Sequence, residues 1–153
     1  MDARYSPIKP CLDDADTDTR NAVWALLSTK VDKIFDDFFE LVMESPHRHL
    51  FENRDFNDIK TKQIEHWETL FTCGDDQDCA EKLNKTYINH KDINVSSVDY
   101  VMAYIHFMTE FHRAVIQNAD GPKQAYEFVR TVNAVVASDI ERALRMYNDV
   151  LSI

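Results

Sequence analysis

Apolar residues recur at helical spacing along most of the chain, and they predict six helices. The apolar positions of each helix lie three or four residues apart, as expected when one helical face turns toward a core. Ser45-Pro46 and Asp120-Gly121-Pro122 interrupt this pattern, because the residue before a proline avoids the α region and glycine favours a turn. The predicted helices span about 17–27, 29–44, 57–72, 79–89, 96–118 and 122 to the end.

Composition supports an all-α fold of one domain. The chain has 153 residues with only two glycines and four prolines, too few breakers for the many turns of a β-sandwich or barrel. Residues 1–17 lack periodicity and are interpreted as an extended leader, followed by one domain over 18–153. The last helix runs to the final residue without a terminating glycine, which predicts that it continues into a further module.

The net charge of −10 disfavours nucleic acid and anionic membranes as partners, since like charges repel. No apolar run reaches the roughly 18 residues of a membrane span, and the acidic N-terminal segment does not resemble a signal peptide. Cys11, Cys73 and Cys79 are an odd set in such a chain. We therefore expect free thiols and a cytoplasmic location, with a Cys73–Cys79 pair as the less favoured alternative.

His90 is the candidate metal ligand of the chain, and it follows the end of a predicted helix in the segment KTYINHKDINV. A neutral imidazole is the usual protein ligand of haem iron. A surface histidine stabilised by the helix dipole is the alternative on residue type alone. The pair His47 and His49 lacks further ligands at zinc-binding spacing, and we find no phosphate-binding loop or catalytic motif.

The surroundings of His90 resemble the bacterial globin-coupled sensor family. In that family the proximal histidine is followed by an aliphatic residue after three positions and by a tyrosine after ten, and His90, Ile93 and Tyr100 have this spacing. The segments VDKIFDDFFELV, QIEHWETLF and SDIERALRMY are similar to other helices of the family. The resemblance implies a globin-like fold, haem b as the cofactor, and His90 as the iron ligand.

The resemblance also implies a set of residues in contact with the cofactor. These are Phe39, Ile59, Gln63, His66, Ile93, Val95, Tyr100 and Tyr104. Phe39 takes the place of the family's distal tyrosine and has no hydrogen-bond donor. Gln63, Lys62 and His66 are alternative distal donors, and Gln63 ranks first because it lies on the apolar stripe of its helix.

Two of these residues have two interpretations each. His66 is either a structural histidine beside Trp67 or a sixth iron ligand. Tyr100 is either a core residue or a hydrogen-bond partner of the proximal imidazole.

The function that follows is a haem-based sensor of a diatomic gas (O2, CO or NO) or of redox state, and not an enzyme. The two last and longest helices predict a homodimeric four-helix bundle that passes the signal to a C-terminal output module. The alternative is a haem-free globin-fold interaction module in a signalling assembly. Retention of His90 disfavours this alternative, whereas Phe39 and the charged Lys62 favour it.

Overall fold

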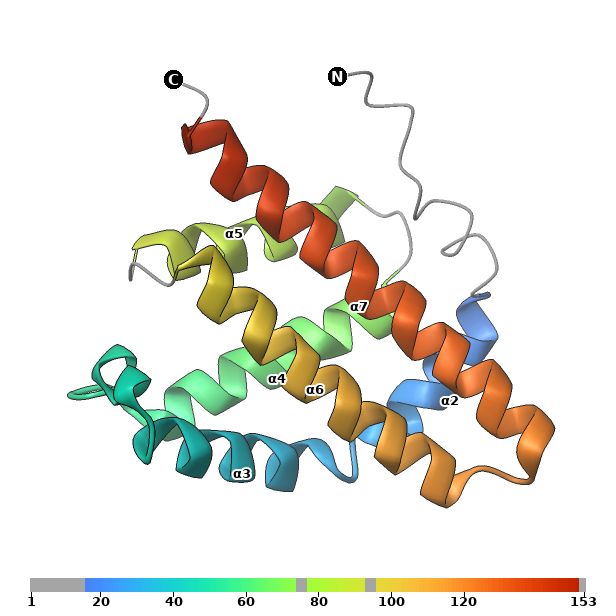
Figure 1. Ribbon diagram of the computed structural model, residues 1–153. Helices are drawn as coiled ribbons and strands as arrows, with labels where there is room; N and C mark the ends of the chain where they lie inside the picture. Colours follow the sequence, from blue (N-terminus) through green and yellow to red (C-terminus); the bar gives the residue numbers. More distant parts are fainter. Residues whose placement is uncertain (1–15, 74–76, 93–95, 152–153) are drawn as a thin grey trace.

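The computed structural model describes residues 16–73, 77–92 and 96–151, and within these ranges it contains helices but no strand. Figure 1 shows α6 and α7 lying side by side across the molecule, with α4 crossing behind them. The prediction of an all-α, globin-like fold is confirmed. The elements are α2 (Thr17–Leu27), α3 (Val31–Met43), the 3₁₀-helix η1 (Pro46–Leu50), α4 (Phe56–Thr72), α5 (Gln77–Asp92), α6 (Ser97–Asn118) and α7 (Pro122–Leu151).

Side-chain caps explain where several helices begin. Asp16 accepts a hydrogen bond from the backbone N–H of Thr19 at 2.7 Å and so starts α2. Asp55 caps α4 and Ser96 caps α6 in the same way. Gly121 has a φ of +94°, a left-handed conformation that turns the chain from α6 into α7. These local signals are why most predicted boundaries agree with the structure to within a few residues.

The core is rich in aromatic side chains from four helices. Trp67 of α4 is 1% exposed and meets Phe111 of α6 edge to face, with ring centroids 5.1 Å apart. Phe35 of α3 packs on Phe107 of α6 at 4.8 Å, and Trp24 of α2 stacks on Phe71 of α4 at 5.8 Å. Large rings that interlock in this way hold α2, α3 and α4 against α6. No helix of the described residues is long and apolar enough to cross a membrane.

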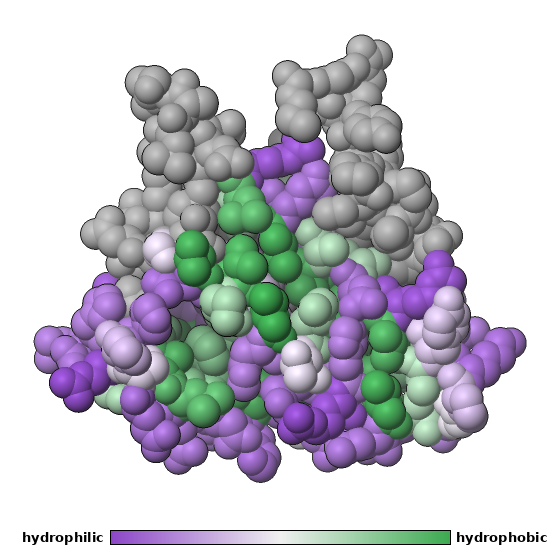
Figure 2. All heavy atoms as spheres, in the orientation of Figure 1, coloured by the Kyte–Doolittle hydropathy of each residue, from purple (hydrophilic) through white to green (hydrophobic). Residues whose placement is uncertain are grey.

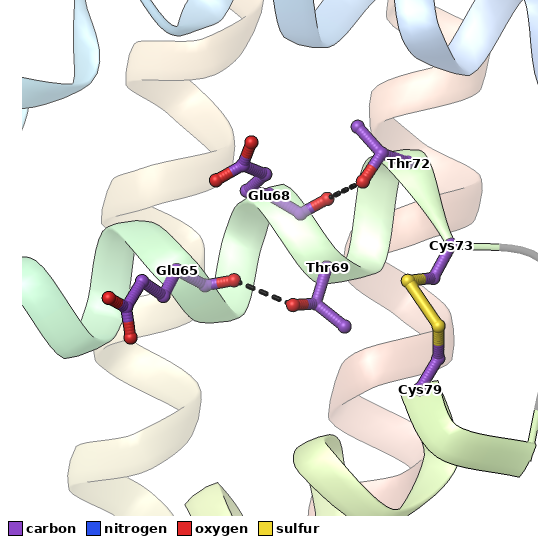
Figure 3. The surroundings of a disulfide bond; sticks show 6 residues. All are labelled: Glu65, Glu68, Thr69, Thr72, Cys73 and Cys79. Atoms are coloured by element: carbon purple, nitrogen blue, oxygen red, sulfur yellow. Dashed lines mark hydrogen bonds between the residues drawn. A yellow bond between two sulfur atoms is a disulfide. The ribbon is translucent and has the colours of Figure 1, made fainter.

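The prediction that Cys73 and Cys79 are free thiols is wrong, because the two form a disulfide (Figure 3). Cys73 ends α4 and Cys79 lies in the first turns of α5, so the bond joins consecutive helices. Their Cα atoms are 6.1 Å apart, a normal separation for a disulfide. The cytoplasmic location, which rested in part on free thiols, stays a prediction. Cys11 and the rest of the predicted leader up to residue 15 lie outside the described residues.

Candidate functional site

A cavity of about 1460 Å³ lies among α3, α4, α5 and α6. Its lining is largely aromatic and aliphatic on the side of α3 and α6, with contributions from Phe35, Phe38, Phe39, Ala103 and Phe107. Pockets for small molecules are usually roughly 300–1,000 Å³, so this cavity has room for a larger flat ligand.

One wall of the cavity belongs to α5, the helix that contains His90. Leu83 and Thr86 of α5 line the cavity, and Leu83 is buried. Position 90 follows Leu83 by two helical turns, and α5 continues without a break to Asp92. Helical register therefore places position 90 on the same face of α5 as the cavity-lining residues. The predicted helix was shorter, at 79–89, whereas the observed helix includes His90.

The opposite wall comes from α3 and α4. Phe39 is 7% exposed, and its ring stacks on Phe56 with centroids 5.3 Å apart, so it offers the cavity an apolar face. Ile59 and Gln63 of α4 also line the cavity, one helical turn apart. Lys62 lies at the same wall, and its Nζ pairs with Asp58 at 2.9 Å on the exposed side of the helix.

His66 is buried at the inner end of this wall and binds a carboxylate from another helix. Its Nε2 lies 3.1 and 3.0 Å from the two carboxylate oxygens of Asp139 in α7. The ring also meets Trp67 edge to face at 6.1 Å. Asp139 is 0% exposed, and a buried carboxylate requires such partners because it has lost its water. This geometry agrees with the structural interpretation of His66, since the Nε2 atom is occupied by Asp139.

Tyr104 and Tyr100 of α6 extend the network. The hydroxyl of Tyr104 donates to Oδ2 of Asp139, and the hydroxyls of Tyr104 and Tyr100 are 3.2 Å apart. A phenol has one proton, so Tyr100 is the donor in this second bond. Burial and the negative charge of Asp139 raise the pKa of Tyr104 well above its ordinary value of 10.0.

The structure brings most of the predicted contact residues to one cavity. Its lining includes Phe39, Ile59, Gln63, His66, Tyr100 and Tyr104. Ile93 and Val95 lie outside the described residues, and for His90 only the helix position is described. Within the described ranges there is no group of three or more His, Cys, Asp or Glu side chains that could hold a metal ion. An iron atom held in haem by one axial imidazole would not form such a group.

Asp139 is the residue that the sequence interpretation missed. A signal was present, because Asp139 lies on an apolar helix face between Val135, Val136 and Ala143. An acidic residue at a core position of an amphipathic helix is unusual and calls for a buried partner. The partner, 73 residues earlier, has no local sequence signal.

The family model of Protoglobin matches residues 11–152, nearly the whole chain. The chain belongs to the Protoglobin family. This membership confirms the resemblance to sensor-type globin domains. No curated protein is similar enough to the chain to count as a match.

As a protoglobin, the chain is a globin-fold domain of a kind that binds haem and gas ligands. The cavity of this chain fits such a group in three respects. It is large, its walls carry aromatic rings that can lie against a flat macrocycle, and a histidine position lies in register on one wall.

Proposed function

We propose that the chain is a sensor domain that binds haem b through His90 and detects a diatomic gas (O2, CO or NO) or a redox change at the iron. The observation that supports the proposal is the register of α5, because position 90 follows the cavity-lining Leu83 by two helical turns. Haem bound in this cavity would supply an iron atom with one coordination position left for a diatomic ligand.

The residues of the chain have distinct tasks in this proposal. His90 binds the iron through a neutral imidazole nitrogen, while Tyr100, buried on the neighbouring helix α6, restrains that side of the cavity. Phe39 keeps the ligand side apolar, and Gln63 is the hydrogen-bond donor that we propose for the bound ligand. Ile59, Ile93, Val95 and Tyr104 complete the contacts with the macrocycle.

His66 is proposed as a structural residue and not as a sixth ligand. The carboxylate of Asp139 lies 3.0 Å from Nε2 of His66, and moving the imidazole away would take one hydrogen-bond partner from this buried carboxylate. We therefore expect ferrous iron without added ligand to be five-coordinate.

We further propose that α6 and α7 form a homodimer that passes the signal to a C-terminal output module. Several large apolar residues of these helices are exposed, among them Val98, Met102, Ile105, Ile116 and Tyr126. Figure 2 shows hydrophobic side chains gathered over the face that α6 and α7 present. Exposed apolar patches of this kind are typical of protein interfaces.

The test is the absorption spectrum of the purified chain titrated with haemin. A Soret band is expected in the wild type and in His49→Ala, a matched control because His49 does not line the cavity. The band should be lost or strongly weakened in His90→Ala. A wild type that stays colourless after haemin addition would refute the proposal and favour the haem-free interaction module, for which the apolar Phe39 is the supporting observation.

A further inference from the structure

No described side chain of helix α7 lines the cavity. The described residues that line the cavity come from α3, η1, α4, α5, α6 and the segments between them, and none comes from α7. A signal that reaches α7 must therefore pass through a residue that touches both the helix and the cavity wall. Asp139 is such a residue, because its carboxylate binds His66 of α4 and Tyr104 of α6, and both of these line the cavity.

Hydrogen bonds suit this task better than the apolar contacts around them. Apolar contacts have no preferred direction, whereas a hydrogen bond weakens steeply when its angle or length changes. The carboxylate of Asp139 is 0% exposed, so water cannot replace a bond that the cavity wall withdraws. A shift of the Tyr104 or His66 ring must then be followed by α7, or the carboxylate loses a partner.

We propose that Asp139 is the positioning residue through which α7 follows the state of the cavity: it joins the wall residues His66 and Tyr104 to the helix that lies behind them. This inference rests on the proposed haem-binding function. It adds a specific connection, from α4 and α6 to α7, that depends on one buried carboxylate.

The experiment compares hydrogen–deuterium exchange of α7 in the full haem-loaded chain, ferrous, with and without CO. In the wild type we expect CO to change exchange in the α7 peptides around Asp139 by about fivefold, the lower end of typical coupling between sites. In Asp139→Asn this CO-dependent difference should disappear while the CO-bound absorption spectrum remains. A merely structural role would speed exchange equally with and without CO and leave the difference in place.

Asn133→Ala is the matched control. Oδ1 of Asn133 in α7 accepts a hydrogen bond from Nε2 of His112 in α6 at 2.7 Å, at an exposed position away from the cavity. This variant loses a polar link between the same two helices and should keep the CO-dependent difference. Tyr104→Phe is the second test variant, in case Asp139→Asn does not fold, and it should also lose the difference.

The possible results separate this inference from the function on which it rests. If no Soret band forms with haemin, the proposed function fails and this inference fails with it. If haem and CO bind but the α7 difference is absent in the wild type, or persists in either Asp139→Asn or Tyr104→Phe, the inference alone is overturned.

Discussion

Replacing Asp139 by leucine tests how much the buried network contributes to stability. Leucine has a similar size but cannot accept a hydrogen bond, so Nε2 of His66 and the hydroxyl of Tyr104 would stay buried without their acceptor. Each buried donor left without a partner costs about 1–3 kcal/mol, and the two together about 2–6 kcal/mol of the free energy of unfolding. For a domain of this size the loss corresponds to a decrease in melting temperature on the order of 10 °C.

The assay is urea denaturation followed by circular dichroism at pH 7, with Asp37→Leu as the control. Asp37 forms an exposed ion pair with Lys33 at 2.7 Å, shorter than the contact of Asp139 with His66. Because solvent screens this surface pair, its loss should leave the urea midpoint nearly unchanged. An Asp139→Leu variant that loses no more than the control would refute the reasoning that burial, and not distance, makes the carboxylate important.

A combined variant refines the same test. In His66→Leu/Tyr100→Phe/Tyr104→Phe/Asp139→Leu the donors to Asp139 and to Tyr104 are removed together with their acceptors, so most of the lost stability should return. If the combined variant is as unstable as the sum of the single ones, the cost comes from packing and not from unsatisfied polar groups.

Three further predictions concern other parts of the molecule. The folded state holds the pKa of Tyr104 above its unfolded value, so the stability that the Tyr104 hydroxyl contributes is full below about pH 10 and declines above it by up to about 1.4 kcal/mol per pH unit. Urea midpoints measured from pH 8 to 11 should therefore decline less in Tyr104→Phe than in the wild type, and equal declines would contradict this. Reduction of the Cys73–Cys79 disulfide by a dithiol should lower the free energy of unfolding by about 2 kcal/mol, as estimated for a short closed loop. Cys73→Ser should have the melting temperature of the reduced wild type, and the dithiol should not change it. Phe39→Tyr adds a hydroxyl to the cavity wall and should slow O2 dissociation in stopped flow by about fivefold, the effect of a hydrogen bond of about 1 kcal/mol; an unchanged rate would show that the new hydroxyl does not reach the ligand.

The helices were predictable because their signals are local. Apolar spacing, the caps Asp16 and Ser96, and the turn at Gly121 all act within a few residues of the chain. The family resemblance orders the proposed contact residues of α3, α4 and α6 along the chain, and the structure brings them to one cavity. The prediction of free thiols at Cys73 and Cys79 was wrong because it rested on the number of cysteines and the apparent lack of an export signal, and neither observation states which sulfur atoms lie close together.

His66 shows most clearly which contacts the sequence predicts and which only the tertiary structure determines. The sequence by itself placed His66 beside Trp67 on the inner stripe of a helix, and left open whether it meets iron or protein. Position 139 lies on the apolar face of the last helix, between Val135, Val136 and Ala143, but no local pattern indicates which residue it contacts. Only the packing of α4 against α7 brings the two within 3.0 Å, across 73 residues of chain. The physical reason is that a buried charge takes its partner from whichever element the core packing places next to it, and no local pattern encodes that neighbour.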